Sequence, residues 1–107
     1  MALPLNVFKT IANDVPAADT EVYEAPIGYN TIVLLAQACN TAAGPENVTF
    51  SHRRGATSVP VVWNYEVPTS ETLVMVQRLV LETGDKLVIS GTSTDLKYVI
   101  SLLETLK

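Results

Sequence analysis

The second half of the chain consists of short apolar runs separated by tight polar turns. Residues 79–81 and 87–89 contain only Leu, Val and Ile, and Gly84-Asp85 lies between them. A third apolar run follows the polar break at residues 91–95. Runs this short and this rich in β-branched residues favour strands over helices. The pattern predicts an all-β domain, with Gly84-Asp85 at a hairpin corner between antiparallel strands.

The same pattern continues through the rest of the chain, where strand candidates begin roughly every ten residues. They cover residues 5–12, 20–25, 29–39, 47–54, 59–67, 71–76 with 78–82, 86–91 and 96–105. About eight short strands predict a single antiparallel β-sandwich, either jelly-roll-like or immunoglobulin-like. At 107 residues we expect one domain over residues 1–107, with residues 1–9 as an N-terminal arm or the first strand.

Three segments indicate which surfaces are buried. Residues 29–39 form the longest apolar run, and their β-branched start favours a strand buried on both faces, with a helix as the alternative. Residues 47–54 alternate, with Val48 and Phe50 on one side, which predicts a half-exposed strand. Residues 59–67 contain Pro60, which lacks a backbone N–H, so this segment is expected at a sheet edge.

Charged residues are scarce for a small domain. They make up 17% of the chain, against roughly 25% in typical soluble domains, while 48% of residues are hydrophobic. Such a composition predicts that part of the surface is covered by a partner, most simply another copy in a homo-oligomer. The net charge of −4 and a single basic pair, Arg53-Arg54, argue against nucleic acid as the main partner. We expect no membrane partner and no secretion signal, because the apolar runs are too short.

Side chains suited to catalysis are few. The one histidine, His52, lacks an accompanying nucleophile motif, so it is predicted to be a surface or interface residue. The one cysteine, Cys39, cannot form an internal disulfide, and one His with one Cys makes no metal framework. Asp85 is predicted to be only a turn residue. We therefore expect no enzyme activity, no cofactor and no metal.

Two aromatic residues are candidates for a binding surface. Trp63 and Tyr65 are two positions apart in an extended segment, so they are expected on one face. Such a pair can present a carbohydrate-binding platform. Alternatively, Trp63 fills the sandwich interior or a subunit interface, where amphipathic rings are favoured.

Taken as a whole, the chain resembles a group of small virion structural proteins of tailed bacteriophages. The resemblance rests on short strand and turn motifs along nearly the whole chain. These are Lys9-Thr10, residues 22–28 leading into 32–34, residues 48–50, Val67-Pro68, residues 81–87 and residues 99–104. The resemblance implies a β-sandwich that attaches to a phage head or tail, often as an oligomer, without chemistry of its own.

These observations predict a non-enzymatic virion protein, first of all a capsid decoration protein that binds the major capsid protein lattice and stabilises the shell. A tail, neck or head–tail accessory subunit is the alternative within the virion. A carbohydrate-binding host-attachment module is the alternative from another class. The residues predicted to lie at the interface are Phe8, Arg53, Arg54, Trp63 and Tyr65.

Overall fold

The computed structural model describes residues 5–107, which form an all-β sandwich of two four-stranded antiparallel sheets. This confirms the predicted fold class. The eight strands are β1 (Asn6–Asp14), β2 (Thr20–Glu24), β3 (Tyr29–Asn40), β4 (Glu46–Arg54), β5 (Thr57–Val67), β6 (Thr72–Leu81), β7 (Lys86–Gly91) and β8 (Leu96–Leu106). Of the segment predicted as an arm or first strand, residues 6–9 belong to β1, and residues 1–4 lie outside the described residues. No helix able to cross a membrane occurs in residues 5–107.

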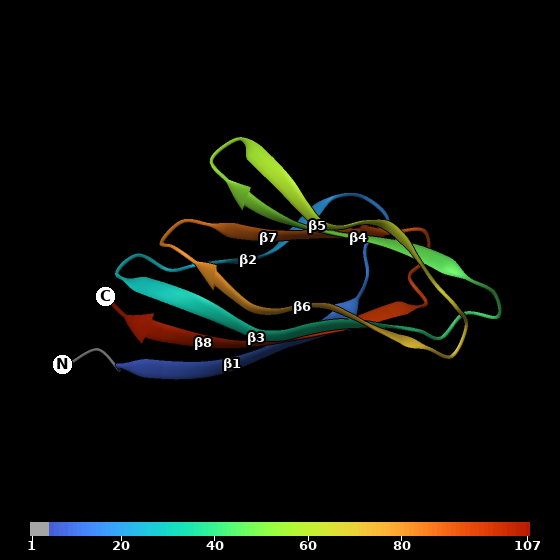
Figure 1. The fold of residues 1–107 in the computed structure, drawn as a ribbon, viewed down its shortest axis with the longest axis horizontal. Coiled ribbons are helices and arrows are strands. Elements are labelled where there is room, and N and C mark those ends of the chain that lie inside the picture. The colour runs from blue at the N-terminus through green and yellow to red at the C-terminus, as the bar shows by residue number, and fades with distance from the viewer. Residues whose placement is uncertain (1–4) are drawn as a thin grey trace.

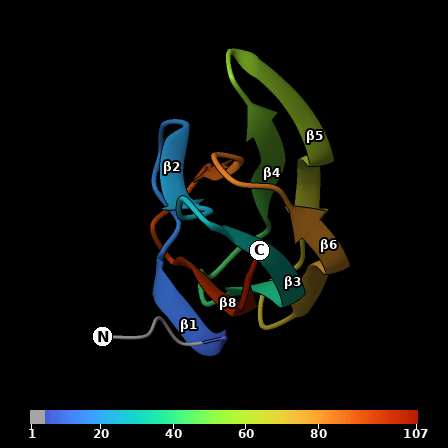
Figure 2. The same cartoon turned by 90° about the vertical axis from the view of Figure 1, so that its left-hand side faces the viewer.

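The strand pairing is that of a jelly roll. Sheet A has the order β1-β8-β3-β6, and sheet B has the order β2-β7-β4-β5. β1 pairs with β8, β2 with β7, β3 with β6 and β4 with β5, so the second half of the chain runs back along the first. Wrapping such a folded ribbon into two sheets gives the jelly-roll alternative rather than the immunoglobulin-like one. Figure 1 shows sheet A below sheet B, and in Figure 2 the β4–β5 hairpin projects beyond the rest of the molecule.

The turn at Gly84-Asp85 is not a hairpin corner, contrary to the prediction. The strands that it joins, β6 and β7, belong to different sheets. Gly84 adopts a φ of 87°, and its N–H donates to the carbonyl of Ala25 rather than across a two-stranded ladder. Only β4 and β5 pair as consecutive strands. The turn is therefore a crossover that holds the two sheets together at one end.

The core lies between the inner faces of the two sheets. Val48 and Phe50 of β4 are fully buried, which confirms the alternation predicted for residues 47–54. β3 is a strand and not a helix, but only its inner face is fully buried. On its outer face Leu34 is 40% exposed. The prediction of burial on both faces was wrong for the single chain, because nothing within residues 5–107 covers the outside of sheet A.

All four sheet edges are interrupted or protected. β2 is short and bulged, and β5 contains Pro60 and a positive φ of 44° at Asn64, as an edge strand permits. β6 has a positive φ of 59° at Arg78. β1 carries Lys9, whose ammonium reaches back to a buried carboxylate. Such features discourage a neighbour from adding a strand to these edges.

Candidate functional surfaces

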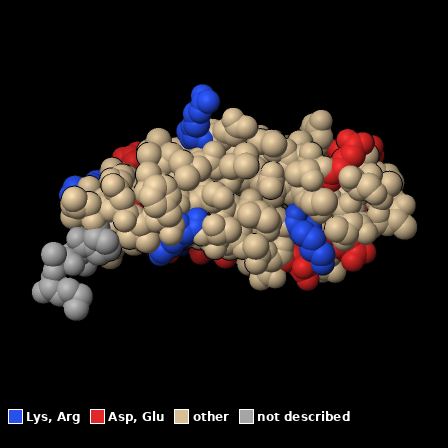
Figure 3. All heavy atoms as spheres, turned by 90° about the horizontal axis from the view of Figure 1, so that it is seen from below, with Lys and Arg blue, Asp and Glu red and all other residues tan. Residues whose placement is uncertain are grey.

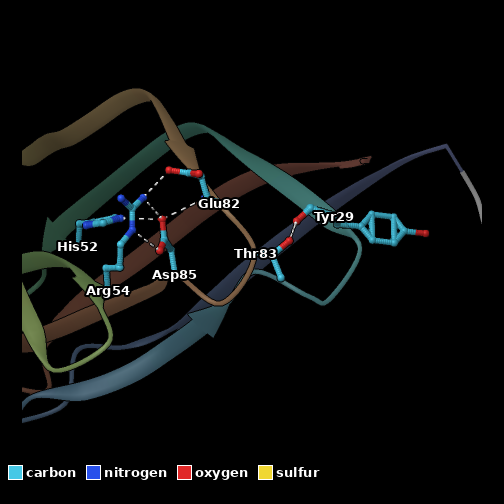
Figure 4. A network of polar contacts seen from close by, with 6 residues as sticks. All are labelled: Tyr29, His52, Arg54, Glu82, Thr83 and Asp85. Carbon is cyan, nitrogen blue, oxygen red and sulfur yellow. Dashed lines mark hydrogen bonds and ion pairs between the residues drawn. The ribbon is translucent and has the colours of Figure 1, made fainter.

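The crossover between β6 and β7 supports a buried carboxylate that binds an arginine (Figure 4). The Asp85 side chain is only 3% exposed. Its Oδ1 accepts from Arg54 Nε at 2.8 Å, and its Oδ2 accepts from Arg54 Nη2 at 2.7 Å. The backbone N–H of Glu82 donates to Oδ2 at 2.9 Å, and His52 Nε2 lies 3.0 Å from the same oxygen. These contacts join the end of β4 to the crossover.

The electrostatics of this cluster favour the charged forms of Asp85 and Arg54. The Arg54 guanidinium hydrogen bonds, helped by His52 and the Glu82 N–H, hold the pKa of Asp85 well below its usual range against the opposing effect of burial. Asp85 in turn raises the pKa of Arg54 above its ordinary value. Asp85 is therefore more than the turn residue predicted from sequence. Its carboxylate pairs with the guanidinium of Arg54, which lies on β4, 31 residues earlier in the chain.

The His52–Asp85 pair has the arrangement of half a catalytic triad but not the rest of it. Nucleophilic catalysis needs a hydroxyl or thiol bonded to the other side of the imidazole. No hydroxyl or thiol in residues 5–107 makes that bond, and the Asp85 carboxylate is occupied by Arg54. What the cluster does show is a link between β4 and the crossover, through the bonds of Asp85 to Arg54 and to the Glu82 N–H.

A second buried carboxylate lies between the sheets on β8. Glu104 Oε2 accepts from the hydroxyl of Tyr23 at 2.5 Å and lies 3.1 Å from Lys9 Nζ. The Tyr23 hydroxyl also hydrogen-bonds to Thr31 Oγ1 at 2.8 Å. Burial, followed by the Glu104 hydrogen bond, raises the pKa of Tyr23 above its ordinary value. This network connects β2 of sheet B to three strands of sheet A.

The outer face of sheet A is apolar across its width. One row of directly opposed residues, one from each strand, contains Phe8, Leu103, Ile32 and Val80. Phe8 is 74% exposed and Val80 is 56% exposed. The two neighbouring rows toward the Asp14 end consist of apolar and uncharged polar side chains. They are Thr10, Ser101, Leu35 and Gln77, then Ala12, Val99, Gln37 and Val74.

Charges are confined to the limits of this face. Asp14 and Lys97 form an ion pair of 2.8 Å in the last row, and Arg78 lies at the β6 edge. Figure 3 views the molecule from the side of sheet A and shows a broad area without charged groups, with basic and acidic side chains toward the margins and one end. We call the rows from Asn6 to Asp14 across the four strands the sheet A outer face.

The outer side of sheet B contains a polar groove with a volume of about 370 Å³. Trp63, 74% exposed, lines it together with Pro60. The other lining residues are polar, namely Asp19, Thr49, Ser51, Ser58, Asn64 and Ser90. We call this the Trp63 groove. Trp63 was a candidate for a binding surface from the sequence, but the polar residues around it were not, because they come from β4, β5, β7 and the segment before β2.

Trp63 and Tyr65 do not share one binding surface, contrary to the prediction. The backbone at Asn64 has a positive φ, and the pairing register of β5 shifts here, so the simple alternation of side chains is broken. Tyr65 lines a separate depression between β5 and the start of β6. Only Trp63 of the two belongs to the groove.

The other predicted interface residues lie in different places. Phe8 belongs to the sheet A outer face, and Arg53 and Arg54 lie at the end of β4. Arg53 donates to Ser58 Oγ at 2.8 Å and lies 3.3 Å from Glu21 Oε1. Both arginines therefore have acidic partners within the chain, and a role for them toward an acidic neighbour stays a prediction. No group of three potential metal-ligating side chains comes together within residues 5–107.

Comparison with known proteins gives a likeness among solved structures. No protein-family model matches the chain, and no curated protein matches it. Among solved structures, the chain is similar to a subunit of Bacillus endospore appendages, described as a family of disulfide-linked pili. The match covers 95% of this chain and 88% of the other, with a TM-score of 0.57 and 16% identity. At that identity the likeness supports the sandwich fold alone.

Proposed function

We propose that this chain is a non-enzymatic structural subunit that assembles in many copies through the sheet A outer face. The observation behind the proposal is the uncharged apolar row that crosses all four strands of that sheet. Large apolar side chains that stay 36–74% exposed on one continuous sheet face are typical of a surface that binds another protein. A second copy of the same chain is the occupant we propose.

The size of the face suits a repeated assembly. β1 is nine residues long, and four strands about 4.8 Å apart at about 3.4 Å per residue give a face of roughly 600 Å². Two copies packed together would cover roughly 1,200 Å², the lower limit of stable specific interfaces. A single contact of this size is weak, so a lasting structure would draw on several identical contacts per subunit. The protected edges favour packing through the face over strand addition.

Two kinds of assembly are proposed for the subunit, a decorated capsid and a fibre. Capsid decoration, in which the subunits lie on a lattice of major capsid protein, stays our first prediction from the resemblance to virion proteins. An appendage-like fibre is a further kind of homotypic assembly to test, since the neighbour of the same fold is a pilus subunit. Disulfide linkage of successive subunits needs at least two cysteines in each copy, and this chain has only Cys39. A fibre of this chain alone would therefore need non-covalent contacts, because one cysteine per copy can join subunits only in pairs.

A charge substitution on the sheet A outer face tests the proposal. Val80→Lys places an ammonium in the apolar row, and Val59→Lys is the matched control because Val59 on β5 is 54% exposed. We expect concentration-dependent association of the wild type by sedimentation velocity, unchanged by reductant. Val80→Lys should be monomeric because its interface would bury an unpaired charge, whereas Val59→Lys should behave as wild type.

Electron microscopy and binding to mature capsids then separate the alternatives. Fibres or rings formed by the purified protein favour an appendage or tail role. Binding to capsids at a fixed stoichiometry, with a higher disruption temperature, favours decoration. A wild type that stays monomeric at high concentration would remove the proposal that a second copy covers the sheet A outer face, even if the protein binds capsids.

A further inference from the structure

We propose that the Trp63 groove is a binding site for a neutral saccharide. The groove lies on the outer side of sheet B, whereas the assembly surface proposed above is the outer side of sheet A. The inference therefore stands independently of the proposed assembly. Its volume of about 370 Å³ lies within the range of roughly 300–1,000 Å³ that is typical of small-molecule sites.

The exposed indole supplies the apolar part of such a site. Trp63 is 74% exposed although it is the largest side chain in the protein, so it contributes little to the core. An aromatic ring has a negative face that attracts partially positive C–H groups. One side of a pyranose ring presents several such groups. Trp63 and Pro60, which both line the groove, offer apolar surface that this side of a sugar can cover.

The rest of the lining matches the hydroxyl groups of a sugar. Six of the eight lining residues carry a hydroxyl, amide or carboxylate. Thr49 Oγ1 already accepts from the N–H of Asn64 at 2.9 Å, and Ser58 Oγ accepts from Arg53 Nε at 2.8 Å. Each of these oxygens still has its own O–H to donate to a ligand. Asp19 supplies a carboxylate acceptor, so the groove offers both donors and acceptors.

The charge of the groove selects against anionic ligands. Asp19 is its one charged lining residue, and no Lys or Arg lines it. Arg53, on the neighbouring part of β4, is occupied by Ser58 and Glu21. A nucleotide, a phosphosugar or a uronic acid would therefore meet a carboxylate without a compensating cation. A neutral sugar faces no such repulsion.

The backbone around Trp63 is held in place before any ligand arrives. The positive φ of Asn64 is stabilised because its N–H donates to Thr49, and the amide of Asn47 donates to the Asn64 side-chain oxygen at 3.2 Å. These bonds fix the bulge that turns Trp63 toward the groove while Tyr65 lies elsewhere. Preorganisation of this kind reduces the entropy lost on binding.

Trp63 is the only tryptophan, so its fluorescence reports directly on the groove. The wild-type protein is titrated with a panel of neutral mono- and oligosaccharides of glucose, galactose, mannose and N-acetylglucosamine. We expect a saturable blue shift with at least one member, confirmed by calorimetry. Calorimetry should then show at least tenfold weaker binding for Trp63→Ala and severalfold weaker binding for Asp19→Asn.

Tyr65→Ala is the matched control, because it removes an exposed aromatic residue from the same strand but outside the groove. It should bind the saccharide as the wild type does. Circular dichroism verifies the fold of each variant. The absence of a saturable response to every sugar in the panel would overturn the inference, as would binding that survives Trp63→Ala or is lost in Tyr65→Ala. A proline-rich peptide that saturates the groove while the sugars do not would also overturn it.

Discussion

Replacing Asp85 with asparagine tests whether the buried carboxylate clamps the crossover to β4. The substitution keeps the size of the side chain but removes the charge that accepts two bonds from Arg54 and one from the Glu82 N–H. A hydrogen bond to a charged group is worth about 1.5–3 kcal/mol, and an amide nitrogen placed opposite the guanidinium forfeits at least one. Arg54 is 58% exposed, so water satisfies its freed donors and limits the loss.

We expect a decrease of about 2–3 kcal/mol in the free energy of unfolding at pH 7, out of a total of roughly 5–15 kcal/mol for a domain. Urea unfolding followed by far-ultraviolet circular dichroism measures it. Tryptophan fluorescence is unsuitable because Trp63 is already 74% exposed in the folded state. With a urea dependence of about 1–3 kcal/mol per molar, the midpoint should fall by about 0.7–3 M. Glu82→Gln is the control, since Glu82 is 65% exposed and surface pairs contribute about 0–1 kcal/mol.

The pH dependence separates the loss of charge from a general packing defect. Because the pKa of Asp85 is lowered in the folded state, its contribution is complete above its unfolded pKa and is lost as pH falls toward the folded one. Below about pH 3.9 the wild type should therefore lose about 1.4 kcal/mol per pH unit relative to Asp85→Asn. A variant whose stability at pH 7 equals that of the wild type, or whose acid curve runs parallel to it, would refute the clamp.

Two further substitutions test the core and the second carboxylate. Gly91→Ala should lower the free energy of unfolding by about 1–3 kcal/mol, as measured by thermal unfolding. The reason is that the new Cβ would lie 2.8 Å from Val15 Cγ1 and 3.1 Å from the Asn47 carbonyl oxygen. Unchanged stability would show that Val15 moves freely. Tyr23→Phe should cost about 1–3 kcal/mol because Glu104 loses a donor. In addition, since the pKa of Tyr23 is raised on folding, wild-type stability should fall above pH 10 more steeply than that of Tyr23→Phe. Parallel alkaline curves would contradict this.

The positions of the strands could be predicted because alternation and turn residues are local signals. Seven strands lie close to their predicted bounds, and the two candidate pieces around residues 71–82 form the single strand β6. Which strands pair is not a local property. Gly84-Asp85 has the composition of a hairpin turn, but the sequence around it does not show that β6 pairs with β3 and β7 with β4. The crossover follows from the closure of two sheets over one core.

The candidate sites, like the strand pairing, depend on contacts between residues that are far apart in the sequence. Asp85 pairs with Arg54, which lies 31 residues earlier. The sequence around Asp85 shows a turn residue and gives no sign of this ion pair. Trp63 could be identified as an unusual exposed aromatic residue, but its separation from Tyr65 depends on a bulge stabilised by Thr49 of the neighbouring strand. The apolar residues of the sheet A outer face were each recognisable as strand residues. Their exposure became apparent only when β1, β8, β3 and β6 were placed side by side.

The two proposed surfaces are compatible because they lie on opposite sides of the sandwich. A subunit that packs through sheet A leaves the outer side of sheet B free, with the Trp63 groove open to solvent. An open polar groove with one aromatic residue binds a single sugar weakly, because few groups are desolvated. Repetition on a lattice changes this, since linked sites raise the effective concentration and add roughly 10²–10⁴-fold in avidity without any new contact. Assembly through one sheet would thus turn a weak groove on the other sheet into a strong multivalent surface, and Val80→Lys should abolish that gain while leaving the affinity of each groove unchanged.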